Sequence, residues 1–484
     1  MVNWVAGMFA RPVSAWYEAT GDERAAKALR GALGGDWWVR AFGNTPTLPS
    51  GAYEAWRITG DAQIAAALKS FADRVVTNRA SEAYAQLPWD GLEDTLNLKR
   101  RHHWALKLPS RHGVYTHEDL LSVFAAYRAT GNRELLDCVR AWYRFLDRRA
   151  RLPFGATVMD EEWGHPGPGR GTETCALAAE TWTRINLLAA LGEGAWGDDV
   201  ERAFYNAAPS AVDRDWRNHV YFQVPNRLEE CPLDRLSVGW SAQDNPSARY
   251  QSKHNPLCCT AGLNRLVPDF VQAMWLRTAD GGAAAALYGP CTVDLKLRGG
   301  RFAAVERTDY PFAETVEIEV SAAPAEEMTL ALRLPGWCPG MTVKVNGKTA
   351  PWTAWDGFAR LRRAWRAGDR ISLRLPMSPR LDMVRDLDDS RKDYAFVSAG
   401  PLLFARGFAE RTANEPAEDP AVPTVNPRTL LDGAEKVVAP LAHPWNWPFD
   451  APVKIRARDA AGRQLELMPY GCTKFRAALL ELED

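Results

Sequence analysis

A short polar turn, Thr-Gly-Asp or Thr-Gly-Asn, recurs in the first part of this 484-residue chain. It stands at residues 20–22, 59–61 and 130–132, each time between an apolar run and an amphipathic one. Glycine ends a helix in the left-handed conformation, and Asp or Asn caps the helix that follows. Looser copies at 192–193 and 278–280 extend the pattern to five helical hairpins. Such repeats predict a solenoid or an α/α toroid, and their irregular spacing favours the toroid, with inserted loops that build a site.

From about Leu287 the hydrophobic pattern changes to alternation, which predicts strands, and Asn346-Gly347 is a strong hairpin-turn signal. We expect an antiparallel β-sandwich over about 287–406, then a Pro-rich arm at 412–427 and a last strand pair. The predicted organisation is multidomain α + β, with three parts: an α/α domain at 1–286, a β-sandwich at 287–410, and an arm with strands completing the β-region at 411–484.

Charge and hydropathy narrow the classes of partner. The chain carries 59 Lys+Arg and 60 Asp+Glu, a formal net charge of −1, which argues against a nucleic-acid partner. No apolar run approaches the roughly 18 residues of a membrane span. Residues 1–10 lack the pattern of a signal peptide, so we expect a cytoplasmic protein, with secretion after removal of a signal left open. The oligomeric state is also open, a homo-oligomer included.

Two cysteine-containing segments are the most informative chemically. Glu173 and Cys175 stand one residue apart, and Cys258 and Cys259 are adjacent. Three thiolates and a carboxylate complete a tetrahedral shell of the soft kind that favours Zn²⁺. The alternative is that these cysteines are ordinary buried apolar residues. The sequence contains no Walker loop, no His-Glu-x-x-His and no Gly-x-Ser-x-Gly, which removes support for nucleotide-dependent, zincin and serine-hydrolase chemistry.

An acidic triplet, Asp160-Glu161-Glu162, precedes a Gly/Pro-rich loop at 164–171. A carboxylate in a loop beside a metal site can act as a general acid/base, whereas three successive acids otherwise indicate a solvated surface. Among the eight histidines, His112 is singled out because it opens an expected inner helix of the toroid. His219 and Tyr221 belong to a polar, mostly alternating run whose members are each expected to be structural when taken singly.

Seven short motifs, taken in order, resemble those of glycoside hydrolase family 127, the β-L-arabinofuranosidase family. They are GTETC at 171–175, HNPLCC at 254–259, DYPF at 309–312, LRLPGWC at 332–338, KVNG at 344–347, AWRAGD at 364–369 and SAGPLLFARG at 398–407. The resemblance extends from near the start of the chain to about residue 410. It implies an (α/α)6 barrel followed by β-sandwich domains, and retaining hydrolysis in which a zinc-bound cysteine is the nucleophile.

The same resemblance implies roles for individual residues. The family's ligand motifs match Glu173, Cys175, Cys258 and Cys259, with Cys258 as the nucleophile. A family branch with Asp-Glu-His before Arg-Gly-Thr-Glu matches the acidic triplet, which implies Glu161 as acid/base and Glu162 as the reserve. Elements that face the substrate match at His112, His219 and Tyr221.

The hypothesis is therefore a Zn²⁺-dependent retaining glycoside hydrolase that releases a terminal β-L-arabinofuranose or a related sugar from an oligosaccharide or glycan. Two rivals remain open at this point: a non-catalytic, zinc-stabilised carbohydrate-binding or scaffold protein, and an α/α-toroid polysaccharide lyase. Relatives carry a further N-terminal segment, so the first domain is expected to be shortened. A sixth hairpin is then expected around residues 89–104 or from a partner chain, or else the barrel is open.

Overall fold

The computed structural model describes residues 2–41, 46–77, 112–213, 215–228, 250–252, 258–387, 390–408, 421–440 and 451–483. The chain forms two compact units. The first comprises Met1–Arg151 and Glu161–Gly164, and the second comprises Leu152–Asp160 and His165–Asp484. The sixth hairpin expected around 89–104 lies outside the described residues. Within the described part, no helix combines the length and apolarity that a membrane crossing requires.

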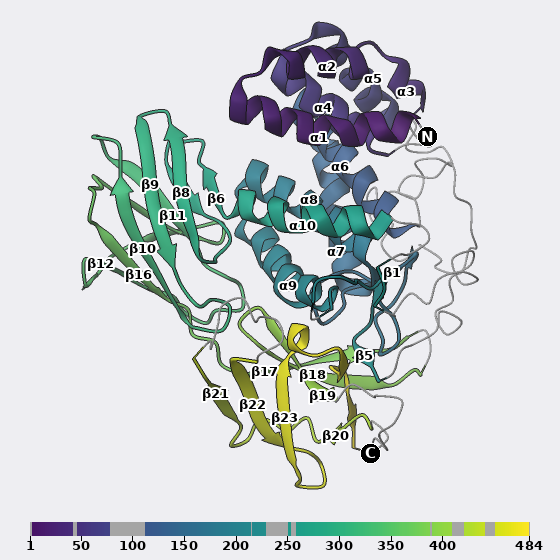
Figure 1. The fold of residues 1–484 in the computed structure, drawn as a ribbon, viewed down its shortest axis with the longest axis vertical. Coiled ribbons are helices and arrows are strands. Elements are labelled where there is room, and N and C mark those ends of the chain that lie inside the picture. Colours follow the sequence, from purple (N-terminus) through teal and green to yellow (C-terminus); the bar gives the residue numbers. More distant parts are fainter. Residues whose placement is uncertain are drawn as a thin grey trace. The chain divides into compact units, whose positions relative to one another are not determined.

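The first unit is helical (Figure 1). Its helices are α1 (Val2–Thr20), α2 (Glu23–Leu33), α3 (Trp37–Ala41), α4 (Leu48–Thr59), α5 (Ala62–Thr77), α6 (Gly113–Thr130) and α7 (Arg133–Arg149). The three predicted Thr-Gly-Asp/Asn turns join them as expected. Their glycines have positive φ angles, and the side chains of Asp22, Asp61 and Asn132 accept hydrogen bonds from the first turn of the next helix. Helix α6 packs against α4, α5 and α7 and is buried over most of its length.

The helices of the second unit are α8 (Thr174–Leu191), α9 (Gly194–Ser210) and α10 (Cys258–Ala273). Helix α8 packs against both α9 and α10, as Figure 1 shows. The predicted turn at Gly192 joins α8 to α9, and its φ of 69° is the left-handed conformation expected for a C-cap. Short strands lie before α8: β1 (Met159–Asp160) pairs in parallel with β3 (Thr172–Glu173), which pairs with β4 (Phe222–Gln223).

The last predicted helical turn, at 278–280, is wrong. The segment is a β-hairpin in which β6 (Trp275–Arg277) pairs with β7 (Ala283–Ala285). Gly281 has a φ of 87°, and Gly282 donates a backbone hydrogen bond to Thr278 Oγ1 at 2.9 Å. Alanine favours helices, but here β7 is buried and also pairs with β11 (Met328–Arg333), so tertiary packing overrides local propensity. The strands therefore begin before the expected change at Leu287.

Two sheets of the second unit share one hydrophobic core and form the expected sandwich. One has the order β13-β12-β16-β10-β9-β8 and the other β14-β15-β11-β7-β6. The remaining bounds are β8 (Cys291–Leu297), β9 (Gly300–Arg307), β10 (Thr315–Ala322), β12 (Thr342–Val345), β13 (Lys348–Thr349), β14 (Thr353–Trp355), β15 (Phe358–Arg363) and β16 (Arg370–Arg374). The predicted Asn346-Gly347 turn joins β12 to β13, and both residues have positive φ angles.

A further sheet has the order β20-β25-β18-β19-β23-β22-β21, with β17 paired to β18. Its strands are β17 (Arg380–Arg385), β18 (Asp393–Ala399), β19 (Leu402–Phe408), β20 (Thr424–Val425), β21 (Glu435–Val438), β22 (Val453–Arg458), β23 (Gln464–Pro469) and β25 (Leu480–Leu482). The predicted last strand pair is β22–β23. Because β17–β19 pair with strands from the C-terminal segment, the expected border at residue 410 falls inside this sheet. Strand β24 (Phe475–Ala477) pairs with β19 and with β5 (Asn226–Arg227).

Candidate active site

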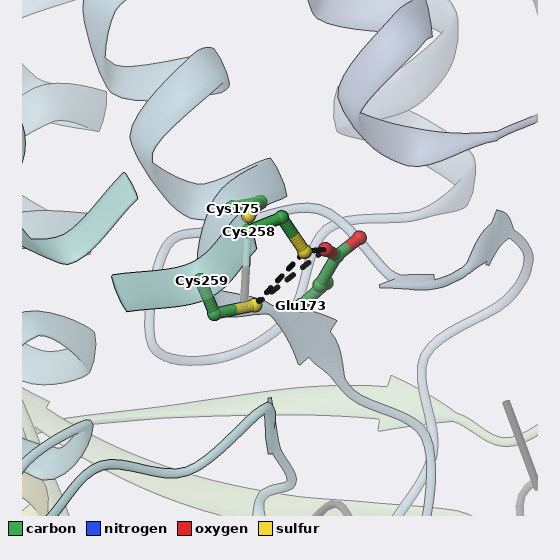
Figure 2. Close-up of side chains that lie close together, drawn as sticks. All are labelled: Glu173, Cys175, Cys258 and Cys259. Atoms are coloured by element: carbon green, nitrogen blue, oxygen red, sulfur yellow. Dashed lines mark hydrogen bonds between the residues drawn. The ribbon is translucent and has the colours of Figure 1, made fainter. Parts of the chain in front are cut away.

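Two pairs of side chains from distant parts of the sequence meet where two helices begin. Glu173 ends β3 and is the N-cap residue of α8, Cys175 lies in the first turn of α8, and Cys258 and Cys259 open α10. The packing of α8 against α10 brings them together (Figure 2). Gly262 permits this approach, because a Cβ there would lie 3.1 Å from Cys175 Cα. The structure thus brings together the four residues expected to hold a metal.

The four donor atoms lie close enough together to share one metal ion. All lie within 4.8 Å of one another. The sulfurs of Cys258 and Cys259 are 4.0 Å apart, and each is 3.5 Å from Glu173 Oε1. Metal–sulfur bonds of about 2.3 Å and metal–oxygen bonds of about 2.1 Å give tetrahedral edges of about 3.6–3.8 Å. The three observed distances lie close to these edges, so the four side chains could hold a metal ion.

Cys258 differs from the other two cysteines. It retains solvent exposure, whereas Cys175 and Cys259 are buried. Hydrogen bonds with Cys175 and Cys259 lower the pKa of the Cys258 thiol well below its usual range, and Tyr221 and Glu173 contribute in the same direction. Burial raises the pKa of the Cys175 and Cys259 thiols. Cys258 is thus the sulfur that most readily carries negative charge and the one that a ligand can reach.

Tyr221 and His219 lie beside α10. The Tyr221 hydroxyl is 3.8 Å from Cys258 Sγ, and its backbone carbonyl accepts a hydrogen bond from Thr174 N at 2.8 Å. His219 Nε2 is 3.4 Å from Thr260 Oγ1, two residues after the nucleophile candidate. Both residues are buried. Tyr221 therefore lies beside the cysteine cluster, and His219 lies beside the first turn of α10.

Glu161 and His112 form a second group, within the first unit. Glu161 is buried and has a φ of 73°, in the left-handed region that non-glycine residues adopt uncommonly. Its carbonyl accepts a hydrogen bond from Gly113 N at 2.7 Å. His112 is the N-cap residue of α6, and its Nε2 lies 3.3 Å from Glu161 Oε2. Glu162 belongs to β2 (Glu162–Trp163).

Asp160 and Glu161 do not lie on the solvated surface that the acidic composition alone suggests. Asp160 is buried, and its carboxylate receives two hydrogen bonds from Arg170, at 2.6 and 2.8 Å. Sequence reasoning gave Arg170 no role. The sequence did contain a signal for this ion pair, namely an arginine in the Gly/Pro-rich loop at 164–171. An arginine near successive acidic residues can bind one of their carboxylates through two hydrogen bonds. This ion pair fixes the residue immediately before Glu161.

Gly171 holds β3 close to β4, and its replacement should disturb Glu173. A Cβ at this position would lie 2.1 Å from the Gln223 carbonyl oxygen, which belongs to the backbone. We expect Gly171→Ala to lower the free energy of unfolding by about 1–3 kcal/mol, the usual range for overpacking, and to reduce the bound metal per chain. Thermal unfolding and metal analysis measure these effects.

Gly169→Ala is the matched control for this substitution, because nothing lies within 4 Å of a Cβ at that position. It should leave both quantities unchanged. Wild-type stability and metal content in Gly171→Ala would contradict the proposed role of the β3–β4 contact.

Comparison with known proteins connects this geometry to a family. Residues 160–272 match the family model described as "Beta-L-arabinofuranosidase, GH127 catalytic domain", and residues 282–377 match "Beta-L-arabinofuranosidase, GH127 middle domain". None of the curated proteins matches the chain.

Solved structures agree in fold. A GH127 β-L-arabinofuranosidase from Geobacillus stearothermophilus T6 is 18% identical with a TM-score of 0.73, covering 99% of this chain and 80% of that one. A GH127 β-arabinofuranosidase is 17% identical with a TM-score of 0.72, covering 99% and 76%, and a structure described as a glycoside hydrolase is 17% identical with a TM-score of 0.72, covering 100% and 83%. These likenesses confirm the predicted fold class, a toroid-like helical part followed by antiparallel β-sheets.

Proposed function

Because the chain belongs to glycoside hydrolase family 127, whose catalytic and middle domains it carries, we propose that it releases a terminal β-L-arabinofuranose or a related sugar from an oligosaccharide or glycan. In this proposal hydrolysis proceeds with retention, Cys258 is the nucleophile, and Glu161 is the acid/base. The observation that carries the proposal is the cluster of Glu173, Cys175, Cys258 and Cys259, in which Cys258 alone combines solvent exposure with a lowered thiol pKa.

We propose Zn²⁺ as the metal and these four residues as its ligands. Three sulfurs and one carboxylate are a soft donor set typical of zinc, and their observed spacing fits tetrahedral coordination. Bound zinc would keep the coordinated thiols deprotonated at neutral pH. Glu173 and the buried sulfurs of Cys175 and Cys259 would anchor the ion, so that Cys258 can keep its exposed position.

The chain's own residues then account for a two-step retaining reaction. The Cys258 sulfur attacks the anomeric carbon while the carboxylic acid of Glu161 protonates the departing oxygen, which gives a thioglycosyl enzyme. The Glu161 carboxylate next removes a proton from water, which hydrolyses the carbon–sulfur bond and frees the cysteine. This is the usual retaining scheme with sulfur in place of the second carboxylate.

Three observations support Glu161 as the acid/base. It is buried, it holds a rarely adopted backbone conformation, and it is paired with His112 at 3.3 Å. His112 is proposed to contact the substrate beside Glu161. His219 and Tyr221 are proposed to do so beside Cys258, where the Tyr221 hydroxyl lies 3.8 Å from the sulfur. The family matches favour hydrolysis over the non-catalytic and the lyase alternatives.

The proposal is tested with the purified wild-type protein and 4-nitrophenyl β-L-arabinofuranoside. We expect release of nitrophenol, β-L-arabinofuranose as the first product seen by proton NMR, and about one zinc per chain, the stoichiometry of one four-ligand site. An inverted first product would contradict Cys258 as the nucleophile. Full activity in metal-free protein would contradict the zinc site, and turnover of other glycosides alone would contradict the substrate.

A further inference from the structure

We propose that Thr174 is a positioning residue, which holds the Tyr221 hydroxyl beside the sulfur of Cys258. This inference rests on the proposed function of Cys258 as the nucleophile. It gives a role to a residue that stands between two of the proposed metal ligands, Glu173 and Cys175, without being one of them. All of these residues belong to the second unit.

Thr174 binds the backbone on both sides of the Tyr221 Cα atom. Its backbone N–H donates to the Tyr221 carbonyl at 2.8 Å, and its Oγ1 hydroxyl donates to the Val220 carbonyl at 2.9 Å. These carbonyls belong to the two planar peptide groups that flank the Tyr221 Cα, so the two hydrogen bonds together restrict the φ and ψ angles of Tyr221. Thr174 is fully buried, so its hydroxyl makes this hydrogen bond without competition from solvent.

The place of the Tyr221 hydroxyl follows from this backbone. Tyr221 is buried, and its ring meets the Phe222 ring edge-on, with the centroids 4.7 Å apart. The hydroxyl at the end of the ring lies 3.8 Å from Cys258 Sγ. A tyrosine ring is placed by only two side-chain torsions. The backbone of Tyr221 therefore determines where the hydroxyl can lie.

Thr174 also lies against the helix that carries the sulfur. A Cβ atom on Gly262 of α10 would lie 3.5 Å from the Thr174 carbonyl oxygen. The residue thus contacts both the segment of Tyr221 and the helix of Cys258, and it helps to set the separation of hydroxyl and sulfur. Its backbone hydrogen bond continues the β3–β4 pairing, whereas the hydroxyl hydrogen bond depends on the side chain and can be removed by substitution.

A hydroxyl in this place serves the second step of the proposed reaction. When water hydrolyses the thioglycosyl enzyme, the electron pair of the carbon–sulfur bond returns to the Cys258 sulfur. A hydrogen bond from the Tyr221 hydroxyl stabilises the negative charge that develops there, and hydrogen bonds to charged groups are the stronger kind. Such a donor contributes most when it is held in place before the charge appears. Thr174 supplies that preorganisation.

Two substitutions of Thr174 separate the hydrogen bond from packing. Valine keeps the shape of threonine but removes the hydrogen bond to Val220, and serine keeps the hydroxyl but loses a methyl group. Both should lower the melting temperature. We expect Thr174→Val to lower kcat for 4-nitrophenyl β-L-arabinofuranoside by about 10-fold, the lower end of the range for a lost hydrogen bond to a charged group, and Thr174→Ser to stay within about twofold of the wild type.

Thr183→Val is the matched control. Thr183 lies on the same helix, is also fully buried, and donates its hydroxyl to the Ala179 carbonyl at 2.9 Å, away from Tyr221 in the sequence. This variant should have a lower melting temperature but wild-type kcat. A purely structural role of Thr174 predicts that activity follows the melting temperature. Equal losses of kcat in Thr174→Val and Thr183→Val, or in Thr174→Val and Thr174→Ser, would overturn the inference.

Combined substitutions test whether Thr174 acts through Tyr221. Tyr221→Phe alone should lower kcat by about 10- to 100-fold. In that background Thr174→Val should change kcat by less than about twofold, because the group that Thr174 positions is gone. Additive losses would overturn the inference. Bound metal per chain should be the same in Thr174→Val as in the wild type, and a lower value would show instead that Thr174 acts through the metal ligands beside it.

A measurement without substrate separates failure of this inference from failure of the proposed function. In crystal structures the Tyr221 hydroxyl should leave Cys258 Sγ in Thr174→Val but keep its wild-type position in Thr174→Ser and Thr183→Val. An unmoved hydroxyl in Thr174→Val would overturn this inference alone. Inactivity of the wild type would overturn the proposed function, while the position of the hydroxyl in these structures would still decide whether Thr174 positions Tyr221.

Discussion

Cys258→Ala is expected to lower kcat by about 10⁴-fold or more, the scale on which loss of a catalytic nucleophile acts. The substitution removes the exposed sulfur but leaves Glu173, Cys175 and Cys259, which keep the α8–α10 contact and three donors for a metal. The protein should therefore fold with a melting temperature close to that of the wild type. Steady-state kinetics on 4-nitrophenyl β-L-arabinofuranoside and thermal unfolding test both halves of this expectation.

Cys291→Ala serves as the control. Cys291 is a half-buried cysteine on β8, and burial raises the pKa of its thiol to about 12, so it has neither the position nor the charge of a nucleophile. This variant should retain wild-type kcat. If Cys258→Ala also retained hydrolysis, Cys258 would be a purely structural ligand. If both variants lost activity equally, the effect could not be ascribed to the cluster.

Removal of the metal is the second large effect that we expect. Chelation with dipicolinate at neutral pH should abolish hydrolysis, and added Zn²⁺ should restore it. Structural zinc binding in small domains is worth about 10–16 kcal/mol, so its loss should loosen the start of α8 and of α10. Cys175 and Cys259, which are 6% and 0% exposed, should then react with iodoacetamide. Mass spectrometry of the alkylated peptides measures this reaction residue by residue.

Cys138 distinguishes local loosening from unfolding of the whole protein. It lies on α7 and is buried, like Cys175, but is remote in sequence from the cluster. It should stay unmodified before and after chelation. Ready alkylation of Cys175 in the protein as purified, or full activity after removal of the metal, would refute the proposed ligand set.

The helical part of the fold could be predicted from the sequence because its signals are local. The turns at Gly21, Gly60 and Gly131 need only a left-handed glycine and a capping side chain, and both are visible in three residues. The hairpin at 275–285 could not be predicted in this way. Its Thr-Ala-Asp-Gly turn resembles the helical ones, and it becomes β-structure only through the pairing of β7 with β11.

The site required non-local knowledge. Nothing in the spacing of Cys175 and Cys258 indicates that α8 and α10 begin side by side. The residue types suggested a shared metal, and the family resemblance assigned these residues as its ligands. The hydrogen bond from Gly113 N to the Glu161 carbonyl could not be predicted for the same reason, because the two residues are far apart along the chain. Burial of Asp160 and Glu161 likewise depends on Arg170 and on packing, whereas the run of three acidic residues alone favoured a solvent-exposed surface.

Helices α8 and α10 both begin at the cysteine cluster, and this arrangement has an electrostatic consequence. Each helix of this length carries roughly half a positive charge at its amino end. Four anionic donors around a divalent ion leave a formal charge of about −2, and the two helix ends together offset about half of it. The peptide dipoles would thus help to keep an electron-rich sulfur stable within the protein, while its exposed face stays available to an electrophilic carbon. In that sense the backbone itself acts as a permanent counterion.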